Sequence, residues 1–235
     1  MTLLKKVSLL RAAVFSGLAF GSVSHAAPNI FWHNSGGDIL LQSDGTDLDS
    51  SFQLELGYFA SSFTPTASNT TEWATYWQPW DLLSTQGGFN PSAGFYASSK
   101  GFNGASTAAV VSEYGQSFSI PTGSQAYMWV YNSKDHLEGT EWALVTNTTS
   151  DGNAAPSWLF PNPSLDASPT DPDWQLLDVG TVVLGGVEDV QGPGSFSANP
   201  GSFALQTSAI PEPGAALLIF TIGIAAQISR RRRVF

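Results

Sequence analysis

The chain has 235 residues, no cysteine, and 19 acidic against nine basic side chains, a formal charge of −10 at pH 7. The lack of cysteine excludes disulfides and thiolate metal sites. Three basic residues lie near the N-terminus and four at the C-terminus, so residues 27–209 carry two lysines against 18 acids, a formal charge of −16. Such a surface repels nucleic acid, whose phosphates are bound by lysine and arginine.

The N-terminus has the three parts of a secretory signal. Lys5, Lys6 and Arg11 precede an apolar run over residues 12–23, and Ser24-His25-Ala26 follows. A charged region, an apolar region and a small-x-small site in this order predict export through the Sec machinery. We expect cleavage between Ala26 and Ala27, which removes residues 1–26. The following 183 residues, 27–209, suffice for one domain that buries about 70% of the surface of its unfolded chain.

The pattern of this domain is mainly β. Residues 52–58 alternate apolar with polar or small side chains, which predicts a strand buried on one face. Residues 126–131 are apolar on both faces and belong in the middle of a sheet, and 141–146 follow after a loop of hairpin length. Further strand candidates are residues 30–33, 39–42, 108–113, 174–184 and 202–206. Short strands separated by Gly, Pro, Asn and Ser are typical of an antiparallel β-sandwich or jelly roll. We predict such a fold, flanked by an N-terminal signal helix and a C-terminal transmembrane helix.

One segment has helical spacing instead. Asn69 is followed three positions later by Glu72, as in a capping box. Aromatic residues then recur at spacings of three and four, at Trp73, Tyr76, Trp77 and Trp80. This predicts a short amphipathic helix, which Pro79 limits to about two turns. The rings of Trp73, Trp77 and Trp80 could form a platform for stacking sugars, or they could pack on the sheet as part of the core.

The acidic loop after residue 42 is the candidate metal site. Asp44, Asp47 and Asp49 supply carboxylates at spacings of three and two. Ca²⁺ takes six to eight oxygen ligands of this kind, although the loop lacks the register of an EF-hand. The other interpretation is a solvated turn, where aspartate and glycine are common. We expect no cofactor, with Ca²⁺ at this loop as the alternative.

Catalytic motifs are scarce. After export only His33 and His136 remain, and the sequence contains no Gly-x-Ser-x-Gly, His-Glu-x-x-His or Gly-x-x-x-x-Gly-Lys pattern. Ser133-Lys134-Asp135-His136 contains the residue types of a triad, but adjacency in sequence is not triad geometry. We therefore expect a protein without catalytic activity.

The C-terminus is the most informative part. Ile210-Pro211-Glu212-Pro213 precedes an apolar segment at 214–229, which four arginines follow. Sixteen residues of helix cover roughly 24 Å, at the lower limit for a bilayer core of about 30 Å. The basic end marks the cytoplasmic side. If the last strand ends at Thr207, Ser208 and Ala209 alone separate it from this tail, so any cut would lie close to the domain.

Residues 210–235 resemble the PEP-CTERM sorting signal of Gram-negative bacteria. The resemblance rests on Pro211, Glu212 and Pro213, on the apolar segment, and on the terminal cluster of Arg230, Arg231, Arg232 and Arg233. It implies recognition by an exosortase, a membrane transpeptidase that cuts near Pro-Glu-Pro. It also implies a transient anchor in the inner membrane, delivery to the cell surface or extracellular matrix, and an association with exopolysaccharide and biofilm.

Two functions remain open for the domain. One is a non-catalytic surface or matrix protein, and the other is an extracellular carbohydrate-binding module with a Trp/Tyr platform. Exposed, coplanar rings would favour the second function, and rings buried beneath strands would favour the first. The side chains that distinguish them are Trp73, Trp77, Trp80, Trp129 and Trp142.

Overall fold

The structure is a computed structural model. It describes residues 28–60, 63–84, 87–102, 120–121, 123–149, 157–161, 171–187, 190–191 and 203–210. This part of the chain is mainly β, with one α-helix. No helix within it is both long and apolar enough to cross a membrane. The predicted signal helix, the transmembrane segment 214–229 and the strand expected at 108–113 lie outside the described residues.

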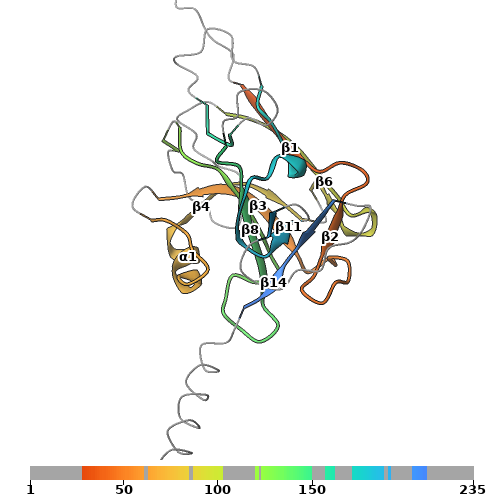
Figure 1. The fold of residues 1–235 in the computed structure, drawn as a ribbon. Helices are drawn as coiled ribbons and strands as arrows, with labels where there is room; N and C mark the ends of the chain where they lie inside the picture. The colour runs from red at the N-terminus through yellow and green to blue at the C-terminus, as the bar shows by residue number, and fades with distance from the viewer. Residues whose placement is uncertain are drawn as a thin grey trace, which may run out of the picture.

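A six-stranded antiparallel sheet forms the centre of the fold (Figure 1). Its strand order is β10-β8-β7-β3-β4, and β14 pairs with β8 beside β10. The bounds are β3 Gln53–Phe59, β4 Trp77–Leu83, β7 Tyr127–Tyr131, β8 Glu141–Thr146, β10 Thr181–Leu184 and β14 Ser208–Ala209. β7 lies between β8 and β3, as its apolar sequence predicts.

Two four-stranded sheets complete the β structure. The first has the order β5-β6-β1-β9, with β1 Asn29–His33, β5 Phe89–Asn90, β6 Phe95–Gly101 and β9 Asp173–Gln175. The second has the order β12-β11-β13-β2, with β2 Ile39–Leu41, β11 Gly186–Val187, β12 Val190–Gln191 and β13 Ala204–Gln206. Two pairs, β1 with β9 and β13 with β2, are parallel, and the others are antiparallel.

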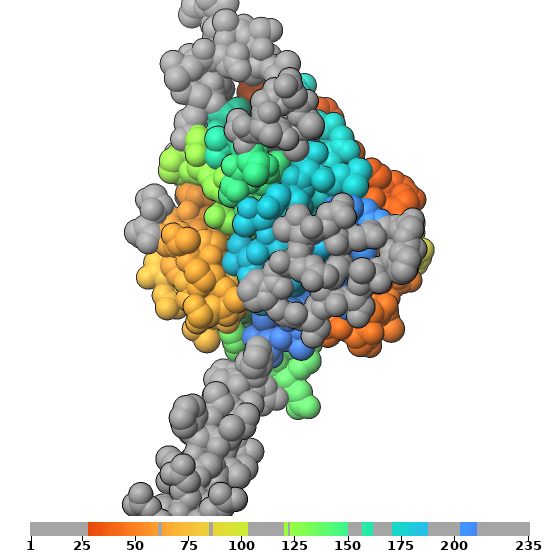
Figure 2. Space-filling view, in the orientation of Figure 1, coloured from red at the N-terminus to blue at the C-terminus, as the bar shows by residue number. Residues whose placement is uncertain are grey.

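The central sheet is buried on both faces. One face shares a core with β1, β2, β6 and β9, and this core contains Trp32, Trp80 and Trp174. The other face carries a second cluster, the aromatic cluster, which α1 (Thr70–Tyr76) covers: Phe59, Trp73, Trp77, Trp129, Tyr131, Trp142, Leu144, Leu184 and Ile210. Figure 2 shows the orange-yellow segment that contains α1 on one side of the molecule and the red-orange segment that contains β2 on the other. The central sheet therefore separates two buried clusters, of which the first is shared with the smaller sheets and the second is covered by α1. The finer prediction of a sandwich or jelly roll stays a prediction.

This arrangement corrects the prediction for β3. Its polar and small positions, Glu55 and Gly57, do not face solvent, because they lie on the side of the aromatic cluster. Glu55 is fully buried. The alternation therefore marks two different buried faces, and one of them is built around a carboxylate.

The helix is shorter than its aromatic spacing predicts. α1 begins at Thr70, but the Asn69 side chain makes no capping hydrogen bond, so the predicted capping box does not form. The helix ends at Tyr76, so Trp77 and Trp80 belong to β4. Pro79 fits within β4 because this is an edge strand, where a missing N–H group need not pair. The register also shifts here, with Gly57 opposite Pro79 and Leu56 opposite Asp81, so Trp80 is the extra residue of a bulge.

The predicted strand over 174–184 is also divided. β9 ends at Gln175, a 3₁₀ turn covers Leu176–Asp178, and β10 begins at Thr181. The turn is held by a capping box, in which Gln175 and Asp178 exchange side-chain to backbone hydrogen bonds. A second 3₁₀ turn, Pro91–Ala93, precedes β6. The turn at Leu176–Asp178 carries the chain from the sheet of β9 to the central sheet, whereas the turn at Pro91–Ala93 joins β5 to β6 within one sheet.

Candidate functional site

The tryptophans proposed as a sugar platform are buried. Trp73 and Trp80 have no exposed surface and Trp77 is 4% exposed, and Trp129 and Trp142 are fully buried as well. Trp73 stacks on Trp142 with ring centroids 5.5 Å apart, and Trp129 meets Trp142 edge-on at 5.0 Å. These rings contact one another instead of solvent, so no sugar reaches their faces. The burial of Trp73, Trp77 and Trp80 favours the core interpretation, so the platform hypothesis is not supported. The helical spacing that suggested it spans a helix and a strand.

A buried carboxylate lies inside the aromatic cluster. One oxygen of Glu55 accepts hydrogen bonds from the Trp77 indole at 2.5 Å and the Lys134 ammonium at 2.6 Å. The other accepts from the Tyr131 hydroxyl at 2.6 Å. The ammonium also lies over the Tyr131 ring, 4.9 Å from its centroid. Since three donors surround Glu55, its charge is compensated, as a buried carboxylate requires.

A second buried carboxylate joins the central sheet to β1 and β6. One Asp81 oxygen accepts hydrogen bonds from the Trp32 indole at 2.8 Å and the Ser98 hydroxyl at 2.6 Å. Lys100 lies 3.8 Å from the other oxygen, donates to the Trp80 carbonyl, and sits over the Trp80 ring. Burial lowers the pKa of Lys100, and the neighbouring Asp81 opposes that shift.

These two pairs account for both lysines of the predicted domain. The side chains of Lys100 and Lys134 are only 16% and 18% exposed, and each ion pair has a carboxylate that is buried. Residues 27–209 contain no other lysine or arginine, so their 18 acids greatly outnumber the basic side chains of that segment.

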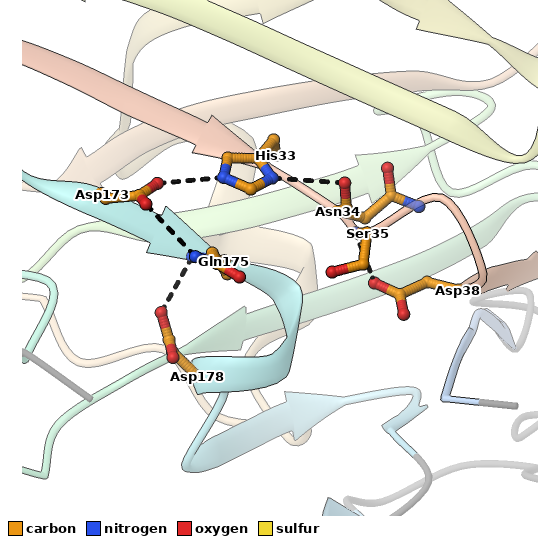
Figure 3. A network of polar contacts seen from close by, with 7 residues as sticks. All are labelled: His33, Asn34, Ser35, Asp38, Asp173, Gln175 and Asp178. Atoms are coloured by element: carbon orange, nitrogen blue, oxygen red, sulfur yellow. Dashed lines mark hydrogen bonds and ion pairs between the residues drawn. The ribbon is translucent and has the colours of Figure 1, made fainter. Parts of the chain in front are cut away.

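A polar network surrounds His33 at the end of β1 (Figure 3). Its Nε2 lies 3.0 Å from an Asp173 oxygen and its Nδ1 3.2 Å from the Asn34 carbonyl. Both contacts are with oxygen atoms, and the donor role of each ring nitrogen depends on the tautomer. Desolvation by burial raises the pKa of Asp38 and of Asp178 nearby.

The hydrogen bonds of this network connect strands and support turns. His33 joins β1 to β9 through Asp173, while Asp178 accepts from the Gln175 amide at 3.0 Å and caps the 3₁₀ turn. Asp38 accepts from the Ser35 amide at 2.8 Å. No set of three or more His, Cys, Asp or Glu side chains suited to a metal ion occurs among the described residues.

The aspartates of the candidate calcium loop each support their own turn. The Asp44 carboxylate accepts from the Thr46 amide and hydroxyl, and Asp49 accepts from the Ser51 amide and hydroxyl. These hydrogen bonds lower the pKa of Asp44 and of Asp49. Asp47 pairs through its backbone with Leu41. The geometry is that of local turns, and the expectation of no cofactor, with Ca²⁺ at this loop as the alternative, stays a prediction.

Residues 133–136 include the residue types of a catalytic triad, but their side chains make separate contacts. The Ser133 hydroxyl accepts from the Asp135 amide at 3.1 Å, and Lys134 reaches Glu55. The His136 ring meets Trp142 edge-on at 4.8 Å. Neither ring nitrogen of His136 has a hydrogen-bond partner among the described residues. The segment is thus a hairpin loop packed on the aromatic cluster.

The last described residues connect this cluster to the tail. Ser208 pairs with Trp142 and Ala209 with Glu141, on the edge of β8 that β10 leaves open. The Ile210 amide donates to the Thr140 carbonyl at 2.8 Å, and its side chain, 6% exposed, packs in the aromatic cluster. The expected linker at Ser208 and Ala209 is therefore absent, because these residues form β14 and the ordered structure reaches Ile210 (Figure 1).

Comparison with known families decides the nature of the segment that follows. Residues 209–233 match the family model of the PEP-CTERM protein-sorting motif. The resemblance seen in the sequence is thereby confirmed. A PEP-CTERM motif implies export, a membrane-anchored intermediate, processing by an exosortase and then exposure at the surface. No curated protein and no solved structure matched the chain.

The PEP-CTERM motif and the folded part of the chain share two residues. The match begins at Ala209, in β14, and includes the buried Ile210. The other sorting residues, Pro211, Glu212, Pro213 and the four arginines, lie outside the described residues, as do Ala26 and Ala27. Sequence reasoning found the motif but missed that its start is built into a sheet, since a two-residue strand has no periodicity to detect.

Proposed function

We propose that this protein is an acidic, non-catalytic domain of the cell surface or extracellular matrix of a Gram-negative bacterium, delivered through its PEP-CTERM tail. The observation that carries the proposal is the sorting motif itself, which begins in the last strand of a folded domain. The signal peptide directs export through the Sec machinery and is removed after Ala26. The segment 214–229 then holds the protein transiently in the inner membrane, with Arg230–Arg233 in the cytoplasm.

The exosortase is the processing partner that the motif implies. We propose an association of the released domain with exopolysaccharide and biofilm, in which it acts as a soluble, acidic matrix component. Its charge supports this role because both lysines of the domain are engaged in ion pairs with Asp81 and Glu55. Nucleic acid, which would be repelled by the remaining acids, is not expected as a partner.

The carbohydrate-binding alternative is less well supported. Its platform requires exposed rings, and those of Trp73, Trp77 and Trp80 lie in the interior. Our proposal that the domain is non-catalytic rests on a similar argument. The candidate residues Lys134 and His136 contact Glu55 and Trp142, so they serve the packing of the aromatic cluster.

Fractionation of the full chain in a strain that carries an exosortase tests this function. Replacing Pro211, Glu212 and Pro213 by alanine should leave insertion intact and block shortening, so the uncleaved form accumulates in the membrane. Replacing the four arginines by glutamine should instead weaken retention and orientation, because the basic cluster is the orienting charge. Shortening and release of the alanine variant at the wild-type rate would contradict the proposed processing.

A further inference from the structure

The start of the sorting motif is held by a continuous series of contacts. Thr207, just before β14, donates from its hydroxyl to the Glu141 carboxylate at 2.6 Å and from its amide to the Leu41 carbonyl at 2.9 Å. β14 then pairs with β8, and the Ile210 amide donates to the Thr140 carbonyl. We call residues 207–210 the strap.

The side chain of Ile210 anchors the end of the strap. It is 6% exposed and belongs to the same buried cluster as Trp73 and Trp142. Pro211 is the next residue, and one residue of extended chain spans at most about 3.6 Å. The Pro-Glu-Pro segment therefore starts within that distance of a buried residue, with no free residue between them.

An enzyme that cuts an extended chain needs the backbone groups of that segment for its own hydrogen bonds. In the strap, which directly precedes the Pro-Glu-Pro segment, the backbone is already paired with β8 and Thr140. Edge strands of this kind open locally without unfolding of the whole domain. When such opening is fast relative to cleavage, the cleavage rate follows the population of the open form.

We propose that the strap controls processing: residues 207–210 must detach from the edge of β8 before the exosortase can engage the Pro-Glu-Pro segment. This inference rests on the proposed function and adds regulation to it. The folded domain thus limits the access of its own processing enzyme. Anchoring of Ile210 in the aromatic cluster sets how often the strap opens.

The test is a pulse-chase measurement of shortening for the full chain in a strain with an exosortase. Ile210→Ala removes the anchor and should speed shortening by about tenfold, since the loss of a buried aliphatic side chain favours the open form. Leu184→Ala is the matched control: Leu184 lies in the same cluster, is equally exposed, and loses the same number of carbon atoms. It should stay near the wild-type rate because it is not part of the strap.

A second variant distinguishes access of the exosortase to the Pro-Glu-Pro segment from the stability of the strap. A short Gly-Ser linker between Ile210 and Pro211 leaves the strap paired but moves the Pro-Glu-Pro segment away from it. We expect this variant to be shortened as fast as Ile210→Ala, and the combination of both changes to be no faster than the linker alone. Acceleration of Leu184→Ala to the rate of Ile210→Ala, or wild-type rates for both Ile210→Ala and the linker variant, would overturn the proposal.

The Pro211-Glu212-Pro213 alanine variant, measured in the same experiment, distinguishes the two proposals. If the alanine variant blocks shortening while the linker and Ile210→Ala have no effect, the exosortase acts at the motif and only the proposal about the strap is wrong. If it is shortened normally, the proposed function itself fails.

Discussion

The Lys134 ammonium lies 2.6 Å from a carboxylate oxygen of Glu55, a residue with no exposed surface. We expect Lys134→Met to lower the free energy of unfolding by about 3 kcal/mol, because removal of one partner leaves a buried charge without its counter-ion. The double variant Lys134→Met/Glu55→Gln should lose less than the sum of its single changes. Urea denaturation followed by tryptophan fluorescence measures both.

The matched control is Glu138→Gln, in the exposed part of the same hairpin loop. A surface substitution of this kind should change stability by less than about 0.5 kcal/mol. If Lys134→Met were as mild as this control, the ion pair would contribute little and the hydrogen bonds from Trp77 and Tyr131 would suffice for Glu55.

Gly57 allows the close approach of β4 to β3. A β-carbon at this position would lie 2.7 Å from the Trp77 ring and also collide with the Gln78 carbonyl. We expect Gly57→Ala to destabilise the protein by about 1–3 kcal/mol, the usual range for overpacking. Gly36→Ala is the control, because a β-carbon at Gly36 would meet no atom within 4 Å. Thermal denaturation should show a lower midpoint for Gly57→Ala alone.

The sequence predicts individual strands better than their surroundings. Strand 127–131 is recognisable because six consecutive apolar residues, 126–131, fit only the middle of a sheet. The pattern of β3 is equally clear, yet it cannot show that Glu55 faces Lys134, which is 79 residues away. Likewise, Trp77 and Trp80 have helical spacing in the sequence although they lie in β4. The bulge that places them there depends on pairing with β3, which the local sequence does not show.

For the candidate sites, too, local features could be predicted from the sequence and contacts between distant segments could not. The sorting motif is local, so its residues could be read directly from the sequence and matched to a family. The burial of the tryptophans and the pairing of Ser208 with Trp142 depend on contacts between distant segments. Short strands such as β14 and β11 have too few residues to carry a period.

Asp178 should make stability depend on pH. Burial raises the pKa of Asp178 above its ordinary value of 3.8. A raised pKa in the folded state stabilises the protein below pH 3.8, and this contribution is lost as the pH rises through the folded-state pKa. We therefore expect Asp178→Asn to become more stable relative to wild type as the pH rises from below 3.8 to neutrality, as measured by urea midpoints.

Asp44→Asn provides a control of opposite sign. Hydrogen bonds from Thr46 lower the pKa of Asp44, so its contribution is present above pH 3.8 and is lost as the pH falls through the lowered value. This variant should lose stability relative to wild type over the same rise in pH. The same slope for both variants would contradict the assignment of the shifts.

Calcium should not stabilise the domain. The carboxylates of Asp44 and Asp49 already accept hydrogen bonds from Thr46 and Ser51 within their own turns. A ligand that binds only the folded state stabilises it by about 2.7 kcal/mol at a hundredfold excess over its dissociation constant. Melting curves in chelator and in millimolar Ca²⁺ should therefore coincide. A clear upward shift with Ca²⁺ that is lost in Asp44→Asn would restore the loop as a metal site.

The mature N-terminus should be Ala27, directly before the first described residue. The Pro28 carbonyl accepts from the Phe102 amide at 2.7 Å, and the Asn29 amide donates to Asp171 at 2.8 Å. Cleavage after Ala26 would thus leave a single residue ahead of this ordered structure. Ala26→Leu should block cleavage, because the signal requires a small residue before the cut, whereas Ala27→Leu, after the cut, should be processed. Intact-mass measurement of the exported protein distinguishes these outcomes, and retention of residues 1–26 in the wild type would show that the N-terminus is instead a permanent anchor.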